Sequence, residues 1–187
     1  MITSEEIAWE LGRQAIEEMQ KGNNQRAFDI FNKALSFDPF LWQAYRGRGL
    51  IYVGWGNYQK AIEDFKRAID TCSDESYIVK ICYELGNVYE SIYLGNRFEF
   101  FEYLEKAFAV YDKIIQIYPT YIPARYRRGC IFYDIVMKSD YSQSLLERIV
   151  EDLDFVLQNE SEDIDTTMKM DAVQKIKVAR LLLSAEQ

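Results

Sequence analysis

The side chains that most often perform catalysis or hold metal ions are few in this chain and far apart. The sequence contains no histidine, and its three cysteines, Cys72, Cys82 and Cys130, form no CxxC pair. Without histidine, neither a Ser-His-Asp site nor a Cys-His site can be built, and the commonest zinc ligand is missing. No glycine-rich phosphate loop occurs either. These absences predict a protein that is not an enzyme, with no catalytic residue and no cofactor.

Carboxylates are concentrated between residues 147 and 165, where eight acids stand against one base, Arg148. Calcium binding is one chemistry that Asp152-x-Asp154 could serve. The calcium loop signature, with its central glycine and terminal glutamate, is absent, so we predict no metal site. We interpret the acidic stretch as a solvated face that aids solubility. A docking surface for a basic partner is the alternative.

The overall charge argues against nucleic acid as a partner. The formal net charge is −8 and the sequence pI is about 4.7, whereas nucleic-acid binding requires a basic face that neutralises phosphates. The chain has no long apolar run and no charged-then-apolar leader, which predicts no membrane insertion. Scattered, unpaired cysteines favour reduced thiols and a cytoplasmic location.

Apolar residues recur at helical spacing along the chain, and turns rich in Gly, Asn, Asp and Pro interrupt them. Thr3 and Glu6 have the spacing of a capping box at the first helix. Only three prolines occur, which suits a mostly helical protein. The predicted helices cover residues 4–19, 25–37, 42–53, 59–71, 77–93, 98–118, 123–137, 142–158 and 166–183.

An internal repeat organises these helices into hairpins. Three residues recur with the same type and spacing 34 positions later: Ala27, Phe31 and Ala34 as Ala61, Phe65 and Ala68. Small residues recur where two helices of a hairpin would cross closely, at Ala15, Gly49, Gly86 and Gly129. In its period and in these small positions the chain resembles the tetratricopeptide repeat family.

The resemblance implies an all-α fold, a right-handed superhelix (α-α solenoid) of about four helical hairpins followed by a capping helix. It is strongest over residues 8–75 and requires insertions afterwards, and the second helix of the fourth hairpin lacks the small-residue signature. We expect one solenoid domain over residues 1–187. Its parts are repeats at about 8–41, 42–75, 79–121 and 122–161, with the capping helix at about 166–185.

The family binds partners mainly in a concave groove lined by the first helix of each repeat. The resemblance therefore implies a protein-interaction module or scaffold that binds a peptide or a partner protein. Tyr and Arg, which are enriched at binding hot spots, occur at several of these positions. The implied groove residues are Arg13, Arg46, Lys80, Tyr83, Asn87, Tyr126, Arg127 and Tyr133. The alternative is that these side chains pack between repeats or beneath the final helix.

The carboxylate clamp of chaperone-binding family members does not recur here. At the corresponding positions only Lys80 matches, which argues against a heat-shock chaperone tail as the ligand. The positions compared are Gly12, Ile16, Gly47, Lys80 and Glu84.

A run of aromatic residues in the insertion at 96–106 suggests a second interface, formed by Phe98, Phe100, Phe101 and Tyr103. An alternative function follows from it: a self-associating structural protein, a homo-oligomer that uses this insertion or an end of the array. The competing interpretation is that the long third and fourth hairpins simply pack on each other.

Overall fold

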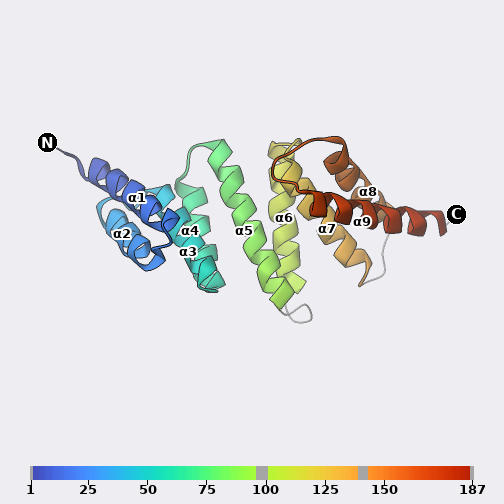
Figure 1. Ribbon diagram of the computed structural model, residues 1–187, viewed down its shortest axis with the longest axis horizontal. Coiled ribbons are helices and arrows are strands. Elements are labelled where there is room, and N and C mark those ends of the chain that lie inside the picture. The colour runs from blue at the N-terminus through green and yellow to red at the C-terminus, as the bar shows by residue number, and fades with distance from the viewer. Residues whose placement is uncertain (1, 96–100, 139–142, 186–187) are drawn as a thin grey trace. The chain divides into compact units, whose positions relative to one another are not determined.

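The computed structural model describes residues 2–95, 101–138 and 143–185, and all the regular structure in these ranges is helical. The chain divides into two compact units, Met1–Tyr103 and Leu104–Gln187, which we call the N-terminal and C-terminal units (Figure 1). Whether they form one continuous solenoid domain stays a prediction. The described helices are α1 (Ser4–Gln20), α2 (Asn24–Phe37), α3 (Trp42–Gly54), α4 (Tyr58–Thr71), α5 (Glu75–Gly95), α6 (Phe101–Ile117), α7 (Ile122–Val136), α8 (Gln143–Gln158) and α9 (Thr166–Ala185).

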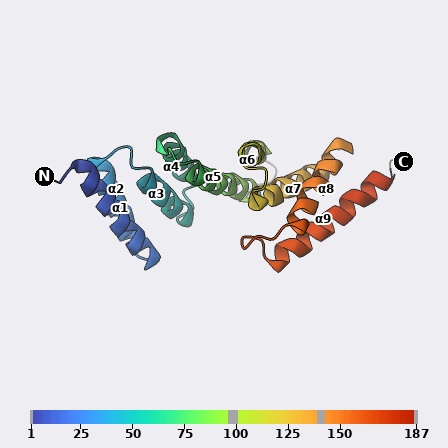
Figure 2. The same cartoon turned by 90° about the horizontal axis from the view of Figure 1, so that it is seen from above.

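Helices consecutive in the sequence pack side by side within each unit. The hairpins α1–α2, α3–α4 and α7–α8 can be followed in Figure 2. The predicted capping box begins α1: Thr3 Oγ1 accepts from the Glu6 N–H at 3.1 Å, and Glu6 Oε2 accepts from the Thr3 N–H at 2.8 Å. The turns of the first two hairpins contain Gly22 and Gly56, whose φ angles of +83° and +71° favour glycine. The 34-residue repeat therefore extends to the backbone of the turns.

Close helix packing in the N-terminal unit depends on glycine in α3. A Cβ atom on Gly47 would lie 2.2 Å from Phe31 Cζ, and one on Gly49 would lie 3.0 Å from Phe65 Cε1. Both phenylalanine rings are fully buried, so they have little room to move away. These glycines let α3 lie directly against the α2 and α4 aromatics, as the small-residue pattern predicts.

The C-terminal unit uses the same device with different residues. A Cβ atom on Gly129 in α7 would lie 2.7 Å from Leu153 Cδ2 in α8. Leu153 therefore occupies the place opposite Gly129 that Phe65 occupies opposite Gly49. This contact fixes the register of the fourth hairpin, which the sequence alone left open.

The last helix, α9, has the bounds predicted for a capping helix and closes the C-terminal unit. It packs along α8 and also contacts α7. Ala172, Ile176 and Ala179 are the buried residues of its inner face, and they join the core formed by α7 and α8. The small alanines allow α9 to lie close to its neighbours.

Candidate functional site

The first helices α1, α3 and α5 of the N-terminal unit present the predicted groove positions on one side, which we call the groove face. Two contacts show that they share it. Trp9 and Ile16 of α1 line a pocket together with Gln43 of α3, and Arg46 of α3 pairs with Glu84 of α5. Trp9 is 58% exposed, so this face presents a large aromatic surface to solvent.

The predicted cations of this face are largely neutralised by neighbouring carboxylates. Arg13 donates to Glu10 at 2.7 Å and also to Glu17. Its hydrogen bond lowers the pKa of Glu10 to about 2. Arg46 holds both oxygens of Glu84, with N···O distances of 2.5 and 3.0 Å. Such two-point pairing uses two of the five N–H donors of Arg46 and offsets its charge, which weakens its attraction for an acidic ligand.

The predicted groove residues of α5 differ in exposure. Lys80 is exposed, and its Nζ lies 5.3 Å from the centroid of the Tyr77 ring. Tyr83 and Asn87 are half-buried, and both interact with other groups of the protein. The groove face therefore combines the exposed cation of Lys80 with paired and partly buried polar groups.

In the C-terminal unit, α9 lies against the predicted groove positions of α7. The Tyr126 hydroxyl donates to Asp171 Oδ2 of α9 at 2.8 Å, and Cys130 Sγ lies 3.8 Å from the same oxygen. Lys175 of α9 stands over the Tyr133 ring at 5.4 Å. Tyr126 is consequently only 7% exposed.

The pKa values of this contact reflect burial and hydrogen bonding together. Burial is the largest cause that raises the pKa of Tyr126, and the carboxylate of Asp171 adds to it. Burial alone would also raise the pKa of Asp171, but hydrogen bonds from Lys175 and Tyr126 outweigh it and lower that pKa. The alternative interpretation of the sequence expected this packing of groove residues beneath the final helix. Arg127, next to Tyr126 in α7, is half-buried and also interacts within the protein.

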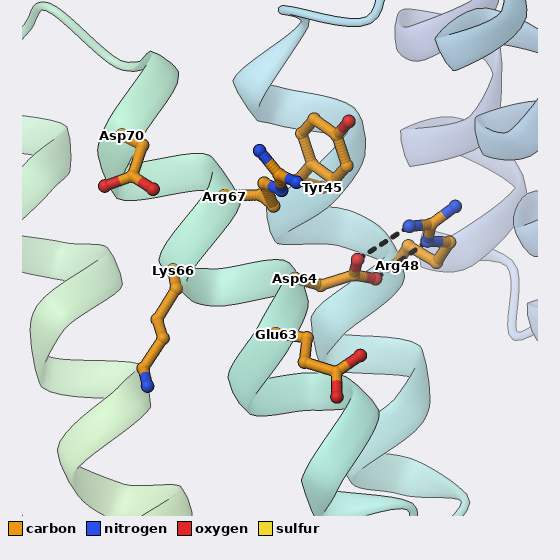
Figure 3. A pocket seen from close by; sticks show the side chains of 7 residues that line it. All are labelled: Tyr45, Arg48, Glu63, Asp64, Lys66, Arg67 and Asp70. Carbon is orange, nitrogen blue, oxygen red and sulfur yellow. Dashed lines mark hydrogen bonds and ion pairs between the residues drawn. The ribbon is translucent and has the colours of Figure 1, made fainter.

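A half-buried arginine clasp joins successive hairpins, and the sequence analysis missed it. Arg48 of α3 donates to Asp64 of α4 at 2.6 and 2.7 Å and to Asn32 of α2 at 2.7 Å. Arg48 therefore bonds both second helices that flank it. The Arg48–Asp64 pair, drawn with dashed lines in Figure 3, lies among the side chains that line a hollow. The volume of this hollow is about 560 Å³. The hollow is lined by Tyr45, Arg48, Glu63, Asp64, Lys66, Arg67 and Asp70.

The C-terminal unit contains a second clasp of the same design. Arg128 of α7 donates to Asp152 of α8 at 2.7 and 2.9 Å and to Asp112 of α6. Arg125 adds a further bond to Asp152, which is fully buried. The spacing from Arg128 back to Asp112 is 16 residues, as from Arg48 back to Asn32. That recurrence of an arginine after a polar residue is the sequence signal that could have found both clasps.

The acidic stretch and the aromatic insertion are only partly described. Asp152 and Asp154 bind arginines, and among the described residues no group of three or more His, Cys, Asp or Glu side chains could hold a metal ion. Phe98 and Phe100 lie outside the described residues. Phe101 begins α6, but its side chain is outside the description. Tyr103 is half-buried, with its ring centroid 6.0 Å from that of buried Tyr89.

Antiparallel helical hairpins that repeat, with small residues where their helices cross, define an α-helical repeat protein. Residues 14–81 match the sequence profile of the tetratricopeptide repeat. Residues 14–81 therefore carry tetratricopeptide repeats, and the described chain has the all-α fold of solved tetratricopeptide repeat solenoids. Proteins with this fold serve generally as non-enzymatic scaffolds for protein–protein interaction. No described helix combines the length and apolar character needed to cross a membrane.

Solved structures share the fold at low sequence identity. YrrB, described as a tetratricopeptide repeat protein with an unusual peptide-binding site, is 18% identical with a TM-score of 0.68, over 92% of this chain and 75% of YrrB. MamA 41-end from Desulfovibrio magneticus RS-1 is 14% identical with a TM-score of 0.65, over 100% and 99% of the two chains. A thermophilic tetratricopeptide repeat protein of Thermus thermophilus is 18% identical with a TM-score of 0.56, over 90% and 98%. No curated protein sequence matches the chain significantly.

Proposed function

We propose that the chain is a scaffold that binds a peptide segment of a partner protein on the groove face of its N-terminal unit. The observation that carries this proposal is the exposure of Trp9 at a groove position. Covering an exposed aromatic ring with a partner lowers the free energy of the complex. Tryptophan is also among the residues most enriched at binding hot spots. YrrB, a structural relative described as having an unusual peptide-binding site, supports the choice of a peptide as the ligand.

The N-terminal unit is the stronger candidate because, within its own described residues, no helix comparable to α9 lies across its groove face. In the C-terminal unit, Tyr126 and Tyr133 are engaged by Asp171 and Lys175 of α9. We therefore assign these two tyrosines chiefly to α9 docking and base the groove on Trp9, Arg46 and Lys80. A cytoplasmic location is part of the same proposal.

The test is an affinity capture from native lysate that compares the wild-type chain with a double variant, Trp9→Ala with Lys80→Ala. The matched control is Phe40→Ala with Lys66→Ala, which removes one exposed aromatic ring and one exposed lysine that are not among the groove positions. We expect a partner retained by the wild type and the control and lost by the groove variant. If both variants retain every captured partner, the groove proposal is wrong.

Self-association is a second candidate, favoured by a specific feature of α9. Met170, Val173 and Leu181 are exposed apolar side chains on this terminal helix. Their spacing places them along one helical stripe, which a second copy could cover. The described part of the aromatic insertion offers no comparable exposed group, because Tyr103 is half-buried.

Sedimentation equilibrium distinguishes this second candidate. A dimer that dissociates on Leu181→Lys substitution, with unchanged helicity, supports it. A strict monomer at high micromolar concentration rules it out. The two functions use different faces, so one can hold without the other.

A further inference from the structure

An open hollow lies between α8 and α9 in the C-terminal unit. The volume of this α8–α9 hollow is about 410 Å³. It is lined by Asp154, Leu157, Val173, Ile176, Lys177 and Arg180. A cavity of about 150 Å³ holds a benzene ring, so the hollow has room for about two or three apolar side chains. None of the lining residues is a predicted groove residue, and the groove function leaves the hollow unused.

Apolar side chains make up much of this lining. Ile176 is buried, Leu157 is half-buried, and Val173 is 48% exposed. Arg180 Nη2 donates to Asp154 Oδ2 at 2.5 Å, so an ion pair bridges the two helices at the hollow. A segment that covered Val173 would remove apolar surface from water, which favours binding.

The two sides of the α8–α9 hollow carry opposite charges. On the α9 side, Lys177 is exposed and forms no ion pair with the described residues. On the α8 side, Glu151 and Glu147 precede Asp154 by three and seven residues, so the three carboxylates lie along one stripe of the helix. Both glutamates are exposed. A segment that enters the hollow therefore meets a cation on one side and carboxylates on the other.

We propose that the α8–α9 hollow docks one amphipathic helix of a partner protein. The apolar face of that helix covers Val173, its acidic edge meets Lys177, and its basic edge meets Glu147 and Glu151. A groove between two helices fits a third because rows of side chains pack into it, with apolar residues at i, i+3, i+4 and i+7. The charges of the two edges then determine which helices are accepted.

The α9 helix of a second copy fits this hollow less well than such a partner helix. The described α9 has four cations and a single carboxylate, which are Lys169, Lys175, Lys177, Arg180 and Asp171. Two copies of α9 packed together would place like charges against each other around Lys177, and like charges oppose association. A helix with one acidic edge avoids this repulsion. Occupation by a second copy is therefore an outcome that the test must distinguish.

The probe is a fluorescein-labelled, alanine-based peptide with leucines at i, i+3, i+4 and i+7, glutamates along one edge and lysines along the other. Two comparison peptides keep the leucines but carry only glutamates or only lysines at the edges, and a staple on the outer face gives all three the same helicity. Fluorescence anisotropy measures binding to the full chain. We expect a Kd on the order of 0.1 mM for the mixed peptide. Each comparison peptide should bind about fivefold more weakly, and high salt should reduce this difference.

Two substitutions test whether the peptide lies in the hollow. Val173→Ser removes an apolar contact and should weaken binding of the mixed peptide about fivefold. Ile117→Ser, at a similarly exposed position of α6, is the matched control and should bind as the wild type does. Lys177→Glu makes both sides of the hollow acidic, so the all-lysine peptide should become the tightest binder. Lys113→Glu, also exposed on α6, should keep the wild-type order of the three peptides.

The helix-docking site is ruled out if the three peptides bind equally, if Lys177→Glu leaves their order unchanged, or if none binds at about 1 mM. Sedimentation equilibrium adds a further check. A chain that is dimeric without peptide, and binds peptide only after dilution to the monomer, would show that a second copy fills the hollow instead. The groove function can fail separately, because Trp9→Ala with Lys80→Ala should leave binding of the mixed peptide unchanged.

Discussion

At the scale of single residues, glycines at helix crossings are a main determinant of how tightly the hairpins pack. Gly47→Ala would place a methyl group 2.2 Å from Phe31 Cζ. Because Phe31 is fully buried, the clash must displace a helix, and we expect a loss of about 1–3 kcal/mol of unfolding free energy. Urea denaturation measures this loss of unfolding free energy.

The same helix contains a matched control for that substitution. Gly54 ends α3, and a Cβ there would meet nothing within 4 Å. Alanine has the higher helix propensity, so Gly54→Ala should leave stability unchanged or raise it by up to about 1 kcal/mol. Equal losses at both positions would contradict the crossing argument.

The buried clasp in the C-terminal unit gives a second prediction at this scale. Asp152→Asn removes the charge that faces both Arg125 and Arg128 in a fully buried place. Breaking a buried ion pair leaves uncompensated charge, and we expect a loss of about 3 kcal/mol or more. Chemical denaturation monitored by circular dichroism provides the measurement.

Asp154→Asn, two residues away in α8, is its control. Asp154 pairs with Arg180, which is exposed at the surface. Exposed pairs contribute about 0–1 kcal/mol, so this variant should remain close to the wild type. Should Asp154→Asn prove as damaging as Asp152→Asn, burial would not be the deciding factor.

At the scale of elements, the docking of α9 on α7 is expected to depend on pH. Asp171 has a lowered pKa in the folded state, so its ionised form stabilises the fold. That contribution is fully present above the unfolded pKa of about 4 and is lost as the pH falls through the lower folded pKa. The window of change therefore lies below about pH 4.

Tyr126→Phe tests this linkage, because it removes one donor to Asp171 and returns the carboxyl pKa toward its ordinary value. We expect a loss of about 1 kcal/mol at pH 7 that shrinks as the pH falls below about 4. Tyr58→Phe in α4 is the control and should show no such pH dependence. Denaturation curves at pH 7 and pH 3 give both values, and a difference independent of pH would exclude Asp171 as the acceptor.

The elements themselves could be predicted from the sequence far better than their contacts. The 34-residue recurrence of Ala27 and Ala61, with the turns at Gly22 and Gly56, determines helices and hairpins because these are local signals. The docking of α9 was only an open alternative. It depends on Tyr126 and Asp171, which lie 45 residues apart outside the repeat period, and no local pattern links them.

The candidate site was predictable to a similar extent. The resemblance placed Arg13, Arg46 and Lys80 at groove positions, but position alone says nothing about pairing. Nothing in the sequence identifies Glu84 as the partner that neutralises Arg46. The α8–α9 hollow depends on how two helices pack, and this only coordinates reveal.

At the scale of the whole molecule, a solenoid transmits disturbance only to its neighbours, because each hairpin contacts those beside it. Asp152→Asn should therefore lower hydrogen-exchange protection in α7, α8 and α9 much more than in α1 and α2. Gly47→Ala should lower hydrogen-exchange protection more in α1 and α2 than in α7, α8 and α9. Hydrogen exchange measured by mass spectrometry on peptic fragments would detect this difference between the helices. Uniform loss along the chain would mean that the molecule unfolds as one cooperative block.

The two arginine clasps also share a spacing that would allow hairpins of this chain to be joined in a new order. In each clasp the arginine follows its upstream polar partner by 16 residues, and a proline, Pro39 or Pro119, lies between them. A chimera that passes from Pro119 directly to Phe40 would keep this spacing and bring Asp112 opposite Arg48. Its carboxylate would replace the amide of Asn32, so that the guanidinium would donate to a charged acceptor in place of a neutral one. Arrays of chosen length could therefore be assembled from this chain by cutting and rejoining at its prolines.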